Sequence, residues 1–324
     1  MNDDEAATVR PMTLAWVQQH LQAGEQIIGS EALRGGITAE MRKLTIGGAR
    51  DGNTRELVLR SYADPLYVER AQEALTGEAD ALTALAGADV TAPKLVAVDS
   101  TAATCEYPSL LMTHLPGRTV LTDDALETRV PLLARQLVAI HAVRPAEPPR
   151  QYVTLTTADT VVVPGDADAT AWAAAIDVIR KPAPAYEGRF LHRDFQPGNV
   201  LFDVPFDTPH PESAAARITG VVDWAGTSWG PADLDVAHCS TNLALLHGPA
   251  WGLRFPEAYE QAGGRLAATA SQRLYWLVRD ALALSEEVSV VSQPWREAGR
   301  TDLTTGAVEE RLDAYVTALM AALR

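Results

Sequence analysis

Two side chains near the middle of the chain have the types and the spacing that phosphoryl transfer requires. Asp194 and Asn199 stand five positions apart within residues 190–202, which read FLHRDFQPGNVLF. The apolar ends of this stretch predict two short buried strands, and Pro197 and Gly198 favour a tight loop between them over a helix. A carboxylate on such a loop can accept the proton of an incoming hydroxyl group, and a carboxamide oxygen can coordinate a magnesium ion on the phosphates.

A third candidate is an aspartate that follows a second apolar run. Residues 218–226 read ITGVVDWAG, so the two valines predict the end of a buried strand with Asp223 at its tip. Asp223 comes 29 residues after Asp194, where a protein kinase carries its second metal-binding aspartate. Asn199 and Asp223 are therefore the candidate magnesium ligands.

Together these two motifs resemble those of the aminoglycoside phosphotransferase family, the small-molecule branch of the protein-kinase-like fold. The first has the spacing HRDxxxxN of a kinase catalytic loop, and the second is followed by GPADLD at residues 230–235. The resemblance is specific over residues 190–235 and looser elsewhere. The chain departs from the pattern in two places: DWA replaces the kinase triplet DFG, and Gln196 stands where many relatives have histidine.

The resemblance implies an α+β, bilobal protein-kinase-like fold, with a small β-rich N-lobe and a larger, mainly helical C-lobe. Residues 1–113 are then the nucleotide-covering N-lobe, and residues 114–117 are the hinge. Residues 118–324 are the C-lobe, which holds the catalytic loop, the metal ligands and the substrate-binding helices. A chain of 324 residues is long enough for two such lobes.

A pair of glycines is the candidate nucleotide-covering turn of the N-lobe. Gly35 and Gly36 stand where a kinase carries its glycine-rich loop. Without a Cβ atom, the backbone amides of such a turn can approach phosphate closely. An ordinary hairpin turn is the alternative interpretation of two adjacent glycines.

Arg60 ends an apolar run, LVLR, at the position where kinases keep a phosphate-binding lysine. Arginine can hold phosphate in a bidentate fork, although its reach and geometry differ from those of lysine. Glu78 is the candidate ion-pair partner of Arg60, and Glu73 is the competing candidate. The alternatives are a solvent-facing arginine on an edge strand and a glutamate favoured in a first helical turn by the helix dipole.

Residues 109–117, SLLMTHLPG, form an apolar strand broken by Pro-Gly. By resemblance this segment leads into the hinge, where the backbone near Met112 and His114 would hydrogen-bond the nucleotide base. An ordinary core strand and turn is the alternative.

The hydrophobic pattern predicts the elements that carry these residues. A helix capped by Thr13 is expected to end near Gly24, and residues 67–86 have the composition of a helix that is interrupted at Gly77. Strands are expected at residues 41–46 and 56–61.

Several C-lobe residues have expected supporting roles. His192 is expected to shape the catalytic loop rather than to act as a base. By resemblance Asp235 anchors the backbone of that loop, although an acid at a helix N-terminus explains it equally well. Acidic residues of the C-terminal helical region are candidate substrate contacts or plain surface residues: Asp280, Glu286, Glu287 and Glu309.

Composition limits the partners that the chain can have. The formal net charge of −15 argues against a nucleic-acid partner, because phosphate backbones bind basic surfaces. This charge is compatible with a cationic small substrate, but solubility alone is the stronger explanation of it. No long apolar run and no secretory signal is present, and the two cysteines are far apart. We therefore expect a cytoplasmic monomer or dimer without a membrane or nucleic-acid partner.

The residues indicate transfer of the γ-phosphoryl group of ATP or GTP, with Mg2+, to a hydroxyl group of a small molecule. By resemblance, an aminoglycoside-type antibiotic is the first candidate acceptor. A kinase of a metabolite alcohol, such as choline, homoserine or a sugar, shares the catalytic set and is an alternative. A nucleotide-binding protein without transfer activity is another, and the intact Asp194, Asn199 and Asp223 argue against it.

Overall fold

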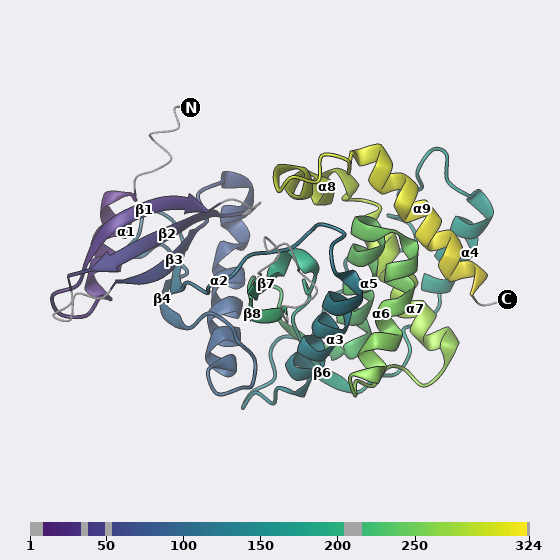
Figure 1. Ribbon diagram of the computed structural model, residues 1–324, viewed down its shortest axis with the longest axis horizontal. Coiled ribbons are helices and arrows are strands. Elements are labelled where there is room, and N and C mark those ends of the chain that lie inside the picture. Colours follow the sequence, from purple (N-terminus) through teal and green to yellow (C-terminus); the bar gives the residue numbers. More distant parts are fainter. Residues whose placement is uncertain (1–8, 34–37, 49–53, 204–215, 323–324) are drawn as a thin grey trace. The chain divides into compact units, whose positions relative to one another are not determined.

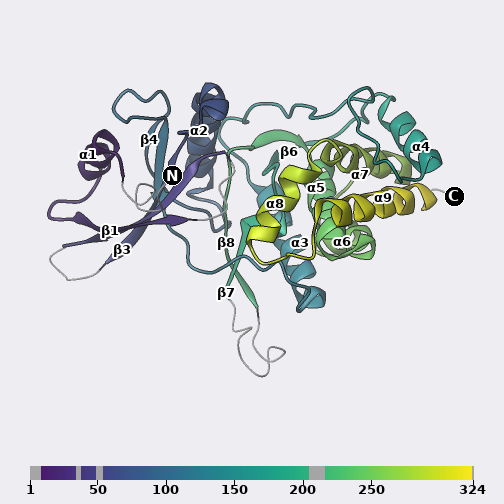
Figure 2. The ribbon, with the colours of Figure 1, turned by 90° about the horizontal axis from the view of Figure 1, so that it is seen from above.

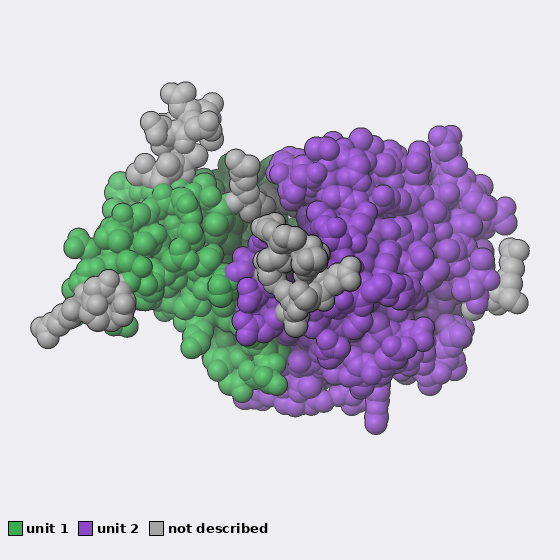
Figure 3. Space-filling model, viewed as in Figure 1, with its two compact units in different colours: residues 1–116, 224–226 green, residues 117–223, 227–324 purple. Residues whose placement is uncertain are grey.

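The computed structural model describes residues 9–33, 38–48, 54–203 and 216–322. The chain forms two compact units (Figures 1 and 3). Unit 1 comprises Met1–Pro116 and Trp224–Gly226, and unit 2 comprises Gly117–Asp223 and Thr227–Arg324. Unit 1 carries the larger sheet and unit 2 most of the helices, so the predicted α+β class is confirmed. The hinge expected at residues 114–117 stays a prediction.

Within the described residues, the sheet of unit 1 has five antiparallel strands in the order β1-β2-β3-β5-β4. They are β1 (Gln26–Leu33), β2 (Glu40–Gly47), β3 (Arg55–Ser61), β4 (Leu95–Asp99) and β5 (Ser109–Thr113). Alternate residues of a strand point to the same face, and this gives the sheet an apolar face. The core on that face includes Trp16, Val17, Leu44, Ile46, Leu57, Leu59 and Leu111. Because β3 is the central strand, Arg60 is buried within the unit.

The first helix of unit 1, α1 (Pro11–Gln19), begins at a proline. Proline suits the first helical position, because its missing N–H would have no partner there and its φ angle is already helical. Thr13 therefore lies inside the helix, where its N–H and its hydroxyl group donate to Glu106 at 2.8 and 2.6 Å. The predicted cap at Thr13 is wrong.

The second helix of unit 1, α2 (Pro65–Leu85), continues through Gly77 without the predicted interruption. Its start is capped by Asp64, whose carboxylate accepts the N–H of Leu66 at 2.9 Å. A glycine inside a helix costs only about 1 kcal/mol relative to alanine. Burial of one helix face, which includes Leu75, offsets that cost.

Unit 2 combines two short antiparallel strand pairs with a group of packed helices. The strand pairs are β6 (Gly188–Leu191) with β9 (Ser228–Pro231) and β7 (Val200–Asp203) with β8 (Arg217–Val221). The helices are α3 (Leu126–Ala142), α4 (Ala169–Ile179), α5 (Ala232–His247), α6 (Pro249–Gln261), α7 (Ala270–Leu284), α8 (Val288–Glu297) and α9 (Thr305–Ala321).

Helix α5 lies at the centre of unit 2, where it packs against α6, α7 and α9 (Figures 1 and 2). Almost every residue of α5 is buried. A helix surrounded in this way is held in one position by its neighbours, so its side chains can be directed at fixed points of the unit.

No helix in the described part of the chain is both long and apolar enough to span a membrane. Cys105 and Cys239 are buried free thiols. Burial raises the pKa of the Cys105 thiol to about 11, so this thiol is protonated at neutral pH.

Candidate active site

The predicted catalytic loop joins β6 to β7 in unit 2. A single 3-10 turn, η1 (Pro197–Asn199), precedes β7, and the N–H of Asn199 donates to the carbonyl oxygen of Gln196 at 3.0 Å. Phe195, within the loop, is fully buried. Burial of this apolar side chain fixes the loop against the core. The polar side chains beside it therefore extend from a backbone of fixed position.

Asp235 on α5 anchors the backbone of this loop. Its Oδ2 accepts the N–H of His192 at 2.7 Å, and its Oδ1 accepts the N–H of Arg193 at 2.8 Å. His141 on α3 lies 3.2 Å from Oδ2. Burial raises the pKa of Asp235, but the hydrogen bond and charge of His141 outweigh this effect, and the pKa lies below its usual value. The anchoring role expected for Asp235 is confirmed.

Two of the four non-glycine residues that have a left-handed backbone in the described ranges lie at the predicted site. Arg193 and Asp223 have φ angles of 72° and 66°, in the left-handed region that non-glycine residues rarely adopt. Such conformations persist only where the surrounding structure holds them, and they cluster at functional sites. Arg193 precedes Asp194, so one strained residue directs the predicted base and the other is a predicted metal ligand.

The side chain of Asp194 is fixed at both carboxylate oxygens. Nδ2 of Asn199 donates to Oδ2 at 2.7 Å, and Nε2 of His238 lies 3.0 Å from Oδ1. Desolvation raises the pKa of Asp194, but the hydrogen bond and charge of His238 outweigh it, and the pKa lies below its usual value. The carboxylate is therefore ionised at neutral pH. Because 40% of the side chain is exposed, a substrate can reach it.

The pairing of β7 with β8 brings the two predicted metal ligands to one end of this strand pair. Val200 lies opposite Val221, and the N–H of Val222 donates to the carbonyl oxygen of Asn199 at 3.0 Å. Asp223 follows directly. A backbone hydrogen bond thus joins Asn199 to Val222, the residue before Asp223.

His192 links the catalytic loop to the end of β8. Its Nδ1 accepts the N–H of Asp194 at 3.2 Å, so Nε2 carries the hydrogen and donates to the carbonyl oxygen of Val222 at 3.0 Å. Burial lowers the pKa of His192, which keeps the ring neutral. Because both ring nitrogens bond the backbone, His192 shapes the loop, as the sequence predicted.

The donor set of Asn199 and Asp223 suits Mg2+. The amide nitrogen of Asn199 donates to the backbone oxygen and to Oδ2 of Asp194, so the amide oxygen is directed away from that carboxylate. Amide and carboxylate oxygens are the ligand types that Mg2+ takes, with water and phosphate oxygens completing its shell. No group of three or more His, Cys, Asp and Glu residues in the described ranges forms a separate metal site.

Sequence reasoning missed His238 as a site residue and treated Asp280 only as one of several helical acids. Nδ1 of His238 lies 3.1 Å from Oδ1 of Asp280 on α7, and Nε2 points to Asp194. A signal was present, because His238 follows Asp235 by three residues on α5 and so shares its helix face. Which helix face meets the loop was not evident from the sequence.

Arg60 and Glu78 form a buried ion pair in unit 1. Nη1 of Arg60 lies 2.7 Å from Oε2 of Glu78, and the side chains are 7% and 1% exposed. Nε of Arg60 also contacts the sulfur of Met41 at 3.3 Å. Arg60 is thus an interior arginine on a central strand, rather than a solvent-facing one on an edge strand.

The positions of the other predicted nucleotide contacts do not test their proposed roles. Gly35 and Gly36 lie outside the described residues. Met112 is buried in β5 between β3 and β4. His114 donates its backbone N–H to the carbonyl oxygen of Glu56 at 3.1 Å, and its ring contacts the Glu56 carboxylate. A base that binds here would therefore use other backbone groups of the segment.

The remaining acidic candidates have local structural surroundings. Glu286 accepts hydrogen bonds from the hydroxyl groups of Thr156 and Thr160, at 2.5 and 2.9 Å, and so secures an irregular segment against the end of α7. Glu287 is the N-cap residue of α8, and Glu309 lies on α9. Of the four acids, Asp280 is the one tied to Asp194.

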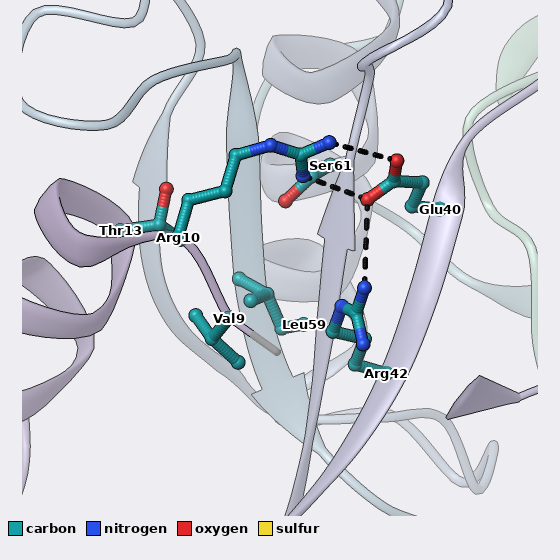
Figure 4. Close-up of a pocket in the computed structure, with 7 residues that line it drawn as sticks. All are labelled: Val9, Arg10, Thr13, Glu40, Arg42, Leu59 and Ser61. Carbon is teal, nitrogen blue, oxygen red and sulfur yellow. Dashed lines mark hydrogen bonds and ion pairs between the residues drawn. The ribbon is translucent and has the colours of Figure 1, made fainter. Parts of the chain in front are cut away.

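A small cavity in unit 1 is too small for a nucleotide or an acceptor (Figure 4). Its volume is about 10 Å³, which is close to the space one water molecule needs. Arg10 lines it and forms a two-bond pair with Glu40, at 2.8 and 3.0 Å. The pair joins the segment before α1 to β2 and is structural.

The family model of the phosphotransferase enzyme family, APH, matches residues 32–273. A search of proteins with curated functions gives no match. A solved structure from Ralstonia eutropha JMP134, provisionally assigned as an aminoglycoside phosphotransferase, is 18% identical, with a TM-score of 0.62 over 98% of this chain and 97% of that chain.

Two other solved structures are similar over nearly their whole length. Aminoglycoside phosphotransferase APH(4)-Ia is 17% identical, with a TM-score of 0.58 over 94% of this chain and 97% of that chain. The GDP complex of aminoglycoside 2'-phosphotransferase-IIIa is 16% identical, with a TM-score of 0.58 over 93% and 96%. At such identities these similarities establish the fold alone.

Proposed function

The chain belongs to the phosphotransferase enzyme family, and from that premise we propose that it moves the γ-phosphoryl group of ATP or GTP to a hydroxyl group of a small molecule. The observation that carries the proposal is the arrangement of Asp194, Asn199 and Asp223 in unit 2. The predicted base and the two predicted oxygen ligands lie on one loop and one strand pair, and buried hydrogen bonds hold both in place.

In the proposed reaction, Asp194 accepts the proton of the acceptor hydroxyl group. The acceptor oxygen forms a bond to the γ-phosphorus, and the bond from that phosphorus to the β,γ-bridging oxygen breaks. The nucleoside diphosphate leaves with the electron pair of the broken bond. Little covalent chemistry is required of the protein, because positioning and charge stabilisation supply most of the catalysis of phosphoryl transfer.

Asn199 and Asp223 are the residues that would hold Mg2+. When bound, the ion neutralises charge on the phosphates. Arg60, held in place by Glu78, orients the phosphates, and a lysine would be a poor replacement at such a site because it lacks the planar fork. The turn at Gly35 and Gly36, with the backbone near Met112 and His114, completes the proposed nucleotide contacts.

An aminoglycoside-type antibiotic is the acceptor we propose. A solved complex of a thermostable APH(4)-Ia mutant contains AMP-PNP and hygromycin B. A complex of spectinomycin phosphotransferase contains ADP and spectinomycin. These are ligands of those proteins, and the net charge of −15 suits a cationic acceptor here. A metabolite kinase is the second candidate, because it would use the same catalytic set. We further propose a cytoplasmic monomer or dimer.

The proposal is tested by nucleotide consumption over a panel of acceptors. The purified protein is assayed with ATP and with GTP, with and without Mg2+, against aminoglycosides and against choline, homoserine and sugars. We expect acceptor-dependent release of diphosphate, a phosphorylated product by mass spectrometry, and a preference for an aminoglycoside. Turnover of a metabolite alone would favour the second candidate, and nucleotide binding without any product would overturn the transfer function.

A further inference from the structure

A histidine on α5 links the proposed base to a buried aspartate on α7. Nε2 of His238 lies 3.0 Å from Oδ1 of Asp194, and Nδ1 of the same ring lies 3.1 Å from Oδ1 of Asp280. The side chain of His238 is 14% exposed and that of Asp280 is 7% exposed. Because α5 and α7 pack against each other, the helical core of unit 2 holds both residues in place (Figures 1 and 2).

The chemistry of these contacts determines the protonation of the ring. Ionised carboxylate oxygens only accept hydrogen bonds, so a ring that bonds one carboxylate through each nitrogen carries a hydrogen on both and is an imidazolium. The amide nitrogen of Asn242 lies 3.2 Å from Nε2, but it donates to the carbonyl oxygen of His238 at 2.9 Å. The ring is therefore a cation between two anions.

Asp194 is consequently held from two elements. Asn199, in η1, donates to Oδ2, and His238, on α5, donates to Oδ1. Together the two donors restrict rotation of the carboxylate about its Cβ–Cγ bond. A base with one orientation presents the same lone pair to every acceptor hydroxyl, and fixed alignment of this kind lowers the barrier to reaction.

We infer that His238, itself held by Asp280, is a positioning residue for the base Asp194. This inference rests on the proposed function. One face of α5 then contacts the predicted catalytic loop at two points. Asp235 accepts a hydrogen bond from the loop backbone, and His238 donates one to the side chain of Asp194. A purely structural role explains the pair less well, because a buried ion pair adds little net stability over apolar residues of the same volume.

The electrostatics agree with this geometry. Burial lowers the pKa of His238, but the charges of Asp280 and Asp194 outweigh burial and raise the pKa well above its usual value. Other ionisable groups also face these residues. His192 lies near Asp194, and Cys239 and Tyr315 lie near Asp280.

The kinetic test compares His238→Ala, His238→Gln and Asp280→Asn with the native protein. We expect His238→Ala to lower kcat roughly 10- to 100-fold, a part of what a general base contributes, with the KM for nucleotide changed less than about twofold. His238→Gln should recover part of the loss, since its Nε2 can donate in place of the ring nitrogen. Asp280→Asn should lower kcat less. An unchanged kcat in His238→Ala would overturn the inference.

His247 provides the matched control. It also lies on α5 and pairs with an aspartate, with Nδ1 2.6 Å from Oδ1 of Asp123, and it is not a site residue. His247→Ala should lower the melting temperature and leave the kcat of the folded protein near the native value. A similar loss of kcat in His247→Ala and His238→Ala would overturn the positioning role in favour of a structural one.

A second measurement does not depend on turnover. NMR of the His238 ring should give a pKa above the usual value, and Asp194→Asn and Asp280→Asn should each lower that pKa. A His238 pKa that neither substitution changes would overturn the inference. If the native protein phosphorylates no acceptor while its His238 pKa responds to Asp194→Asn, the proposed function is wrong and the link between His238 and Asp194 still holds.

Discussion

Asp194 is the residue on which the proposed reaction depends most. Its carboxylate receives hydrogen bonds from two different elements, and 40% of its side chain is exposed. The side chain is therefore oriented by the protein and still open to an acceptor. Neighbouring Arg193 adopts a strained backbone conformation, with a φ angle of 72°, and Asp235 holds its N–H. The protein thus maintains backbone strain next to the proposed base.

Asp194→Ala should abolish most turnover and leave nucleotide binding nearly intact. We expect kcat to fall by roughly 10²- to 10⁴-fold, the usual contribution of a general base. Nucleotide affinity should change little, because the proposed contacts to the phosphates come from other residues. Steady-state kinetics and calorimetric titration measure the two effects. Asp203→Ala is the control, since Asp203 is an exposed aspartate at the end of β7. Full activity of Asp194→Ala would contradict the assignment of the base.

Asp223→Ala should weaken nucleotide binding in the presence of Mg2+ and have little effect without it. We expect a loss at least as large as the roughly 10- to 100-fold that removal of an outer-shell partner costs a metal site. Alanine also strains the backbone here, because φ of Asp223 is 66°. Asp223→Asn controls for this strain, as asparagine tolerates such angles and keeps one ligand oxygen. Equal nucleotide affinity of native and Ala proteins with Mg2+ would rule out a ligand role.

At the scale of elements, buried carboxylates fix the ends of strands and loops. Asp235 fixes the loop after β6, and Asp99 fixes the turn after β4. The carboxylate of Asp99 accepts the backbone N–H groups of Ala103, Thr104 and Cys105, at 2.9, 2.7 and 2.8 Å. In both places one side chain satisfies backbone donors that have no strand or helix partner.

The turn after β4 should become less stable in acid. Burial raises the pKa of Asp99, but the hydrogen bonds to its carboxylate outweigh burial and lower the pKa from 3.8 to about 2. A lowered pKa means that the ionised group stabilises the fold above about pH 4 and that this contribution is lost as the pH falls through 2. The contribution at neutral pH is about 2 kcal/mol.

Urea unfolding of the native protein and of Asp99→Asn over this pH range measures the effect. The difference in free energy of unfolding between the two proteins should be largest near pH 7 and should shrink toward zero near pH 2. Other titrating carboxylates cancel in this comparison, because both proteins contain them. A difference that does not change with pH would contradict the assigned pKa.

At the scale of the whole molecule, the net charge of −15 has two interpretations, and the salt dependence of activity distinguishes them. If the charge draws in a cationic acceptor, kcat/KM for a polycationic aminoglycoside should fall about tenfold or more between 0.01 and 0.15 M salt. A neutral acceptor should show little change and serves as the control. Equal salt dependence for both acceptors would indicate that the charge serves solubility alone.

The family and the phosphotransferase class of enzyme expected from two short motifs are confirmed by the family match. The protein-kinase-like fold is confirmed by the similar solved structures. The roles of individual site residues remain predictions, although the structure brings Asp194 and Asn199 into direct contact and pairs Arg60 with Glu78. Local propensity failed at Thr13, where the helix begins at Pro11 instead, and at Gly77, where burial of one helix face prevailed.

The sequence by itself determined which segment is the candidate for catalysis and which strand follows it. Asp194, Asn199 and Asp223 lie within or next to short elements, and their spacing along the chain is enough to relate them. The tertiary structure alone decided that His238 meets Asp194, 44 residues away, and that Asp280 meets His238, 42 residues further on. The physical reason is that helical periodicity identifies a buried face, while the packing of α5 against α7 decides what that face touches.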